Sequence, residues 1–328
     1  MDALEAIEPE WRALWEADPR ATPFQHPGWL LPWTRHLWGG GKIRTLALRC
    51  QGRLAGLAPL FLWGFGGRPE TVRVSFLGAG ITDYLDVLAA PQADQECAAA
   101  VLDWLWRNRR EWDLCDLQEL RPESPLLRAA LPREFLPDAA PCSICPVARL
   151  AATPDEHLAA LDPKFRTDLR RAENRLRGAG ALEFRRGDAL LEELFRLHAA
   201  RWKDRHEEGV LATERLQAFH RESAARLSEA GMLRLYALFV DGRCIAAQYN
   251  IAARQRVYAY LSGFDPEWGK YSPGGVLLKH SLCEAIREGA GEFDFLRKPE
   301  AFKYLWGARD QVNRRLVLSH AAAGQEVA

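Results

Sequence analysis

Two segments far apart in the chain share a pattern in which two apolar runs flank a short polar turn. The first segment, Thr45–Gly64, turns at Gln51-Gly52-Arg53, and the second, Arg234–Ala253, turns at Asp241-Gly242-Arg243. Turn residues between apolar runs predict a β-hairpin, and Asp-Gly is the strongest short signal of this kind. We therefore predict one antiparallel hairpin in each half of the chain.

The order of elements after each hairpin is also repeated. Each half continues with a strand, a helix and a second strand: Val72–Leu77, Asp94–Trp112 and Asp113–Leu120 in the first half, and Arg256–Phe264, Gly275–Glu288 and Glu292–Pro299 in the second. A helix that connects two strands of one sheet makes them parallel. The sequence therefore predicts an α/β fold of the mixed-sheet type. Two similar domains lie in tandem, each a mixed, mostly antiparallel sheet flanked by helices.

A proline-rich stretch separates the two halves. Arg121–Pro146 contains several prolines, so a single long helix is not expected there. We place the domain boundary in it, with an N-terminal domain at 1–145 and a C-terminal domain at 146–328. The length of 328 residues also suits two domains.

The second domain is predicted to begin with helices. Thr153 can cap one helix, and Pro163 ends it. A second helix, about Lys164–Arg177, carries six basic residues. They form either a solvated helix face or a basic wall that meets phosphates or an anionic acceptor. Two further helices are expected within 190–205 and 213–231.

Composition and charge limit the classes of protein. The chain is 48% hydrophobic and 27% charged, which is typical of a globular protein, and its net charge of zero argues against a dedicated nucleic-acid binder. No basic-then-apolar leader and no apolar run of membrane-spanning length is seen. The seven cysteines are scattered, so we expect no disulfide framework. This cysteine usage predicts a protein of the reducing cytoplasm. The lone pair Cys142 and Cys145 lacks further metal ligands, and we expect no metal.

The segment Ser272-Pro273-Gly274-Gly275 lies between a predicted strand and a predicted helix. A helix start exposes unpaired N–H groups and the positive end of the helix dipole, and glycines let a phosphate approach the backbone. Ser272 suits the cap, and Pro273 the first helical position. The segment is neither GxGxxG nor a Walker P-loop. It is either an ordinary cap or an anion cradle.

Five segments together carry a family resemblance: "TPFQHPGWLLPW" at 22–33, "GAGITDYLD" at 78–86, "HAARW" at 198–202, "YSPGGVLLKH" at 271–280 and "EFDFLRKPEAFKYLWG" at 292–307. With the order of elements, they resemble the GNAT fold of acyl-CoA-dependent N-acyltransferases. In their individual residues, the five segments resemble the CelD-like (cellulose-biosynthesis-associated) acetyltransferases. These enzymes have two GNAT-like halves, as the Fem peptidyltransferases do.

The resemblance implies that the helix start holds the CoA pyrophosphate, with Ser272, Gly274, Gly275 and Val276 as cofactor-binding residues. The usual Gln/Arg-x-x-Gly-x-Gly/Ala loop of the family is absent. The corresponding helix of the first half has acidic residues near its start, which would repel a pyrophosphate. If one half alone binds CoA, it is the second.

In the GNAT arrangement the thioester lies between the central strand and the next one, here Arg256–Phe264 and Glu292–Leu296. Asp294 stands between two phenylalanines and could act as a base or orient one, or be a carboxylate satisfied by its neighbours. Tyr304 matches the position of the thiolate-protonating tyrosine of GNAT enzymes, or is a core residue. Lys303 would pair with Asp294 or bind an anionic acceptor.

Further residues are candidates for substrate binding. Tyr260 and Gln248 lie on predicted strands of the second half, where core packing is the alternative. Asp83, Tyr84 and Asp86 form an acidic loop in the first half that could bind a cationic amine or a sugar. Ordinary turn chemistry is the alternative for that loop.

We interpret the chain as a cytoplasmic acyltransferase that uses acetyl-CoA or another acyl-CoA as donor. The acceptor would be an amine or hydroxyl of a polar small molecule or of an envelope or polysaccharide precursor. One alternative is a Fem-like aminoacyl transferase that uses charged tRNA. Another is a non-catalytic GNAT-like subunit of a polysaccharide-synthesis complex.

Overall fold

The computed structural model describes residues 2–65, 71–133, 135–204, 211 and 213–320. The chain divides into two compact units, Met1–Ser143 with Val312–Ala328, and Ile144–Gln311. Strands β8 (Phe135–Arg149) and β14 (Arg309–His320) contribute residues to both units. In the part of the chain that is described, no helix is long and apolar enough to cross a membrane. All seven cysteines are free thiols.

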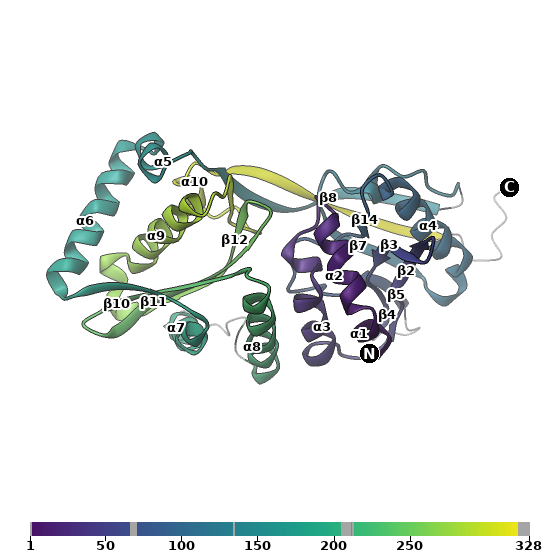
Figure 1. Cartoon of the computed structure of the whole chain (residues 1–328), viewed down its shortest axis with the longest axis horizontal. Coiled ribbons are helices and arrows are strands. Elements are labelled where there is room, and N and C mark those ends of the chain that lie inside the picture. The colour runs from purple at the N-terminus through teal and green to yellow at the C-terminus, as the bar shows by residue number, and fades with distance from the viewer. Residues whose placement is uncertain (1, 66–70, 134, 205–210, 212, 321–328) are drawn as a thin grey trace. The chain divides into compact units, whose positions relative to one another are not determined.

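Unit 1 contains a mixed sheet in the strand order β1-β4-β5-β7-β14 and a smaller sheet β2-β3-β6. Strands β5 and β7 are parallel and are connected through helix α4, which confirms the predicted crossover. Helices α1, α2 and α3 precede the strands (Figure 1). The bounds are α1 Asp2–Ala6, α2 Glu8–Ala17, α3 Pro27–His36, β1 Lys42–Ile43, β2 Leu46–Cys50, β3 Arg53–Ala58, β4 Leu60–Phe65, β5 Thr71–Phe76, β6 Leu88–Ala89, α4 Asp94–Arg107 and β7 Leu114–Leu120.

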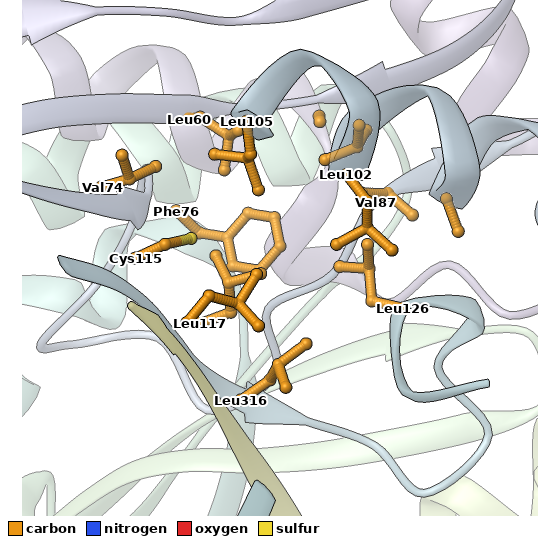
Figure 2. Packing of buried hydrophobic residues seen from close by; sticks show 14 of the residues in the cluster. Leu60, Val74, Phe76, Val87, Leu102, Leu105, Cys115, Leu117, Leu126 and Leu316 are labelled. Atoms are coloured by element: carbon orange, nitrogen blue, oxygen red, sulfur yellow. The ribbon is translucent and has the colours of Figure 1, made fainter. Parts of the chain in front are cut away.

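The core of unit 1 forms where α4 covers the sheet. Val101, Leu102 and Leu105 of α4 lie in one buried cluster with Phe76 and Leu117 from the two parallel strands. Figure 2 shows Leu102 and Leu105 of the helix near Phe76 and Leu117 of the strands, together with Leu316 of β14. Burying a side chain of this size contributes about 1.5–3 kcal/mol, so this cluster holds the crossover together.

Unit 2 contains a mixed sheet in the order β8-β13-β12-β11-β10-β9. β12 and β13 are parallel and joined through α9, and the other strand pairs in this order that the structure resolves are antiparallel. The bounds are α5 Pro154–Ala160, α6 Pro163–Ala179, β9 Leu182–Arg186, α7 Leu191–Asp204, α8 Glu214–Glu229, β10 Leu233–Val240, β11 Arg243–Ala253, β12 Arg256–Phe264, α9 Pro273–Arg287, β13 Glu292–Asp294 and α10 Ala301–Tyr304.

Helices cover both faces of the sheet in unit 2. Gln248 of β11 accepts a hydrogen bond from Ser281 of α9 at 3.0 Å, whereas the ring of the next residue, Tyr249, lies 6.1 Å from that of His220 in α8. Successive side chains of a strand point to opposite faces, so α9 and α8 cover opposite faces. Helix α6 packs beside α9, as Figure 1 also shows.

Both predicted hairpins are present. Gln51 and Gly52 in the first turn, and Asp241 and Gly242 in the second, all have positive φ, which matches the right-handed twist of the paired strands. The predicted caps at Thr153 and Thr213 also form, because each hydroxyl accepts a hydrogen bond from the backbone N–H three residues on.

The proline-rich stretch differs from the expected linker. Most of it is the long strand β8, and the two units divide within that strand, between Ser143 and Ile144. The sequence assigned everything after residue 145 to the second domain, but the chain from Val312 groups with unit 1. The physical reason is pairing: β14 lies antiparallel to β7, with Leu316 opposite Leu117.

Candidate functional site

The start of helix α9 is formed by Ser272, Pro273, Gly274 and Gly275, and none of these residues is acidic. Ser272 is exposed and adopts a left-handed backbone with φ of 53°. Its side chain makes no capping hydrogen bond, so the predicted serine cap is wrong. Pro273 occupies the first helical position, as predicted, and no acidic residue lies in the first turn.

The two glycines at this helix start are not required by packing. A Cβ on Gly274 would meet Phe264 at 3.7 Å, and one on Gly275 would meet Leu169 at 3.7 Å, both ordinary contact distances. Neither glycine has positive φ. Glycine is up to about 1 kcal/mol worse than alanine inside a helix. The two glycines therefore lower the stability of α9. Because they have no Cβ, they also leave the backbone at the helix start open to a ligand.

The N–H groups at the start of α9 are only partly used within the helix. Those of Gly275 and Val276 both point toward the carbonyl oxygen of Ser272, at 3.1 and 3.2 Å. The N–H of Gly274 precedes the first helical hydrogen bond and has no intrahelical acceptor. Val276 is buried in the core against Leu277 and Tyr236, so of this residue only the backbone can reach a ligand. The start of α9 thus combines backbone donors with the positive end of a helix dipole.

Strand β12 lies between β13 and β11 in the sheet. It pairs with β13 through Arg256, Val257 and Tyr258, and β13 then ends at Asp294 while β12 continues to Phe264. The pairing of the two parallel strands therefore ends after Tyr258, and the second half of β12 has no partner strand on that side.

A bulge lies in the same part of β12. Tyr249 of β11 is opposite Leu261, but the next residue, Asn250, is opposite Ala259, so Tyr260 is the extra residue. Bulges interrupt the hydrogen-bond ladder, re-aim side chains and often occur next to active sites. The sequence does not reveal this bulge, because Tyr260 fits an ordinary strand pattern.

Tyr260 adjoins a buried polar cluster between α8 and β11. The ring of His220 lies 5.6 Å from that of Tyr260 and 6.1 Å from that of Tyr249. Burial, and then the nearby His198, lower the pKa of His220 to about 3, so the imidazole is neutral at physiological pH. Burial also raises the pKa of the Tyr249 hydroxyl. Sequence analysis missed His220. The available signal was its position three residues before Ser223, which puts both polar residues on the buried face of α8.

Gln248 lies on the opposite face of β11 from Tyr249. It is buried, and its side-chain oxygen is held by the Ser281 hydroxyl of α9. Two residues along the strand, Asn250 is fully buried, and neither its amide nitrogen nor its amide oxygen has a partner within the described chain. Gln248 thus ties the strand to α9, and in this structure it belongs to the sheet–helix interface.

Asp294 is fully buried at the end of β13. One oxygen accepts the N–H of Leu296 at 2.9 Å, and the other lies 3.4 Å from the guanidinium of Arg256, which also pairs with Glu292. Phe293 and Phe295 pack against each other with ring centroids 5.2 Å apart, as the alternation predicts. A carboxylate with both oxygens engaged is a weak candidate for a base.

Lys303 stabilises the loop that follows β13. Its ammonium is buried and donates to four successive backbone carbonyls, those of Phe295, Leu296, Arg297 and Lys298, at 2.7 to 3.2 Å. Leu296 and Lys298 have positive φ, so the lysine fixes an unusual loop. The ammonium also lies 3.3 Å from the carboxylate of Glu300, and its pairing with Asp294 stays a prediction.

Tyr304 is partly exposed on α10. Its hydroxyl donates a hydrogen bond to Asp310 at 2.6 Å, and this bond raises the pKa of the tyrosine. A tyrosine that stays protonated can give a proton to a leaving thiolate. Of the predicted catalytic residues, Tyr304 is the one with an accessible reactive group.

The acidic loop of unit 1 is mostly buried. Tyr84 packs near Phe24, at a ring distance of 6.2 Å, and the Asp83 carbonyl accepts a hydrogen bond from Asn313. Asp86 accepts hydrogen bonds from the Val87 N–H and the Ser124 hydroxyl. Burial raises the pKa of Asp86 to about 7. These partners fit the turn-chemistry alternative for the loop.

The described residues include no group of three or more His, Cys, Asp or Glu that could hold a metal ion.

Residues 163–304 match the family of acetyltransferase (GNAT) domains. This range contains the start of α9, the parallel strands β12 and β13, and α10. No curated protein matches the chain in sequence.

Solved structures share the fold over nearly the whole chain. FemX is 13% identical with a TM-score of 0.70, covering 94% of this chain and 95% of FemX. A conserved protein of unknown function from Bacteroides thetaiotaomicron is 12% identical with a TM-score of 0.64, covering 96% and 97%. L-PGS from Bacillus licheniformis is 10% identical with a TM-score of 0.56, covering 90% and 91%. Each similarity concerns the fold, which is the predicted mixed α/β type with helix-flanked sheets.

Proposed function

We propose that unit 2 catalyses acyl transfer from acetyl-CoA or another acyl-CoA to an amine or hydroxyl of a polar acceptor. The observation that carries this proposal is the start of α9, where two glycines open the backbone without any packing reason, inside the range that matches a GNAT domain. The acceptor would be a polar small molecule or an envelope or polysaccharide precursor, as the CelD-like resemblance implies.

The proposed chemistry needs few groups. The donor pyrophosphate would lie against the backbone N–H groups of Gly274 and Gly275, with Ser272 beside it. The thioester would lie where β12 continues beyond β13, near the bulge at Tyr260. The acceptor nitrogen or oxygen attacks the thioester carbonyl and releases one proton to solvent, the C–S bond breaks, and Tyr304 would protonate the leaving sulfur and regain its own proton from solvent.

The buried polar cluster next to the bulge would face the acceptor side. His220 is neutral and can accept or donate a hydrogen bond without bringing a charge into the site. We assign it, with Tyr260, to positioning the acceptor rather than to holding a positive charge. Asp294 and Lys303 would hold the loop around the site.

A thermal-shift and calorimetric titration of the full-length protein with acetyl-CoA tests the proposal. Saturable binding is expected, with about 2.7 kcal/mol of added stability at 100 times the dissociation constant. Gly274→Val should abolish that binding and leave unliganded melting little changed, with Gly291→Val, in open space beyond the far end of α9, as control. No heat and no stabilisation at millimolar acetyl-CoA would contradict the proposal.

A second candidate keeps the fold and changes the donor. Among the described residues, no ion pair reaches the side chains of Lys164, Arg170 and Arg175, which are exposed on α6. Such unpaired basic residues favour an anionic macromolecule, and a Fem-like aminoacyl transfer from charged tRNA would use one. Binding of charged tRNA together with failure of acetyl-CoA to bind would favour this candidate.

A further inference from the structure

A group of polar side chains lies inside unit 2, on the face of the sheet away from α9. Helices α7 and α8 cover this face, as Figure 1 shows. We call five residues the α7–α8 polar cluster: His198 of α7, His220 and Ser223 of α8, Tyr249 of β11 and Tyr260 of β12. The first four are buried, and Tyr260 is half-buried. The cluster is therefore closed off by the two helices and reaches toward solvent at Tyr260.

Local features of the sequence place the helix members of the cluster. His220 and Ser223 are three residues apart on α8, so both lie on its buried face. Gly263 of β12 lets α7 approach the sheet, because a Cβ at this position would lie 2.6 Å from the backbone nitrogen of His198. A side chain at 263 would therefore push away the turn of α7 that carries the histidine.

Three rings of the cluster meet at the bulge of β12. The ring of Tyr260 lies 5.8 Å from that of Tyr249 and 5.6 Å from that of His220. Tyr260 belongs to the second half of β12, which has no partner strand on the side of β13. The thioester is proposed to lie at this place. The cluster thus adjoins the point where an acceptor would meet the donor.

Two hydroxyls of the cluster are buried without a hydrogen-bond partner among the described residues. They are the hydroxyls of Ser223 and Tyr249, and both residues are 0% exposed. Buried polar groups are nearly always hydrogen-bonded, because an unmade bond costs more free energy than a made bond contributes. Two such hydroxyls next to the proposed reaction point are suited to a partner that comes from outside the chain.

The cluster disfavours charge of either sign. Burial, and then the nearby His198, lower the pKa of His220 to about 3, so its positive form is disfavoured. Burial, and then the exposed Asp188, raise the pKa of Tyr249, so its negative form is disfavoured as well. The loss of water that has this effect on the protein's own groups acts equally on a ligand. An ammonium or a carboxylate would therefore bind poorly there.

We propose that the α7–α8 polar cluster binds the acceptor, and that the acceptor presents an uncharged hydroxyl of a sugar-like polyol rather than an ammonium. This inference rests on the proposed function and narrows its acceptor. The hydroxyl oxygen attacks the thioester carbonyl, the C–S bond breaks, the hydroxyl proton passes to solvent, and the sulfur takes one proton. The products are an ester and the free thiol of CoA. Neighbouring hydroxyls of the same acceptor bond to Ser223 and Tyr249.

The first test compares acceptors that differ in one group. The full-length protein receives acetyl-CoA, labelled in its acetyl group, and one of three methyl glycosides: glucoside, 6-amino-6-deoxyglucoside or glucuronide. At neutral pH these are uncharged, cationic and anionic. We expect an alkali-labile ester on the glucoside, with kcat/KM about tenfold or more above that of either charged analogue. Faster formation of an alkali-stable amide on the amino analogue would overturn the proposal.

The second test removes the two buried hydroxyls. Ser223→Ala and Tyr249→Phe should each raise the KM for the methyl glucoside about threefold to tenfold and leave the affinity for acetyl-CoA unchanged. Melting temperatures should stay the same or rise, because neither hydroxyl has a partner among the described residues. The control Tyr236→Phe removes the hydroxyl of a buried tyrosine on the α9 face, whose ring lies 5.4 Å from that of His280. Its KM should equal that of the wild type.

The other outcomes separate this inference from the function on which it rests. A clear fall in melting temperature in both variants would show that the hydroxyls bond within the protein, and would overturn the inference. Unchanged KM in both variants would overturn it too, as would binding of acetyl-CoA without transfer to any of the three glycosides. Failure of acetyl-CoA to bind would overturn the proposed function itself.

Discussion

Helices α4 and α9 occupy the same step of a strand–helix–strand crossover, one in each unit, but they begin differently. Helix α4 has Asp94 and Glu96 in its first turn, and Asp94 lies within 3.8 Å of both Arg20 and Arg128. Helix α9 has no acidic residue there and begins with two glycines. The first helix dipole is met by the protein's own carboxylates, whereas no carboxylate lies in the first turn of the second.

A second feature is common to both units. Arg73 of β5 is opposite Leu114, two residues before Asp116, and Arg256 of β12 is opposite Glu292, two residues before Asp294. The Arg–Asp distances are 4.0 Å and 3.4 Å. The same Arg–Asp pair therefore also occurs in unit 1, where the helix of the crossover, α4, has acidic residues at its start. We infer that it belongs to the fold of each unit, which makes Asp294 a structural residue.

The largest effect is expected from giving α9 the acidic start of α4. Gly274→Asp should weaken acetyl-CoA binding by about 100-fold or more, because a carboxylate would face the pyrophosphate. The same change should leave melting unchanged or slightly higher, since an acidic residue at a helix start contributes about 0.3–1 kcal/mol. Calorimetry and thermal melting measure both, with Glu96→Gln in α4 as control. Unchanged acetyl-CoA affinity in Gly274→Asp would contradict the comparison.

The next effect concerns the repeated Arg–Asp pair. Asp116→Asn and Asp294→Asn should each lower the free energy of unfolding by about 1–3 kcal/mol, since a buried amide replaces a carboxylate that accepts charge-assisted hydrogen bonds, from Arg315 to Asp116 and from Arg256 to Asp294. Urea denaturation measures the loss. Turnover per folded molecule should be the same in both variants. A selective loss of turnover in Asp294→Asn would return this residue to the catalytic role that the sequence first suggested.

The fold could be predicted further than the site. Alternation and turn residues were sufficient for both hairpins and both crossovers, because these depend on local chemistry and on burial of one face. The strand β8 was missed, since prolines usually interrupt sheets and its pairing depends on distant segments. Lys303 could not be placed from the sequence, because its partners are backbone carbonyls of a loop with unusual φ angles. The bulge at Tyr260 likewise depends on the register between β11 and β12.

A buried acid in unit 1 should give a characteristic pH dependence. The pKa of Asp86 rises from 3.8 to about 7 on folding, so the folded state holds its proton more tightly than the unfolded state. Stability from this group is therefore present at low pH and is lost as pH rises from about 4 to about 7, by about 4 kcal/mol. Asp86→Asn keeps the hydrogen-bond acceptor and should remove this slope in denaturation curves at several pH values. An unaltered slope would contradict the assignment.

Unit 2 should show the opposite and smaller effect through His220. Its pKa falls from 6.5 to about 3 on folding, so the unfolded state binds the proton more tightly. Stability is then lost as pH falls below about 6.5, by about 1–2 kcal/mol at pH 5. His220→Gln should flatten this acid limb while retaining a neutral polar side chain. Nuclear magnetic resonance titration of the imidazole provides an independent check, and protonation near pH 6.5 would refute the prediction.

Hydrogen–deuterium exchange of the full-length protein, with and without saturating acetyl-CoA, compares the two helix starts most directly. The account predicts slower amide exchange at residues 274–276 when the donor binds, and no change at residues 94–97, where acidic side chains already occupy the helix start. Equal exchange with and without acetyl-CoA at the start of α9, or protection at α4 instead, would contradict the claim that unit 2 holds the donor.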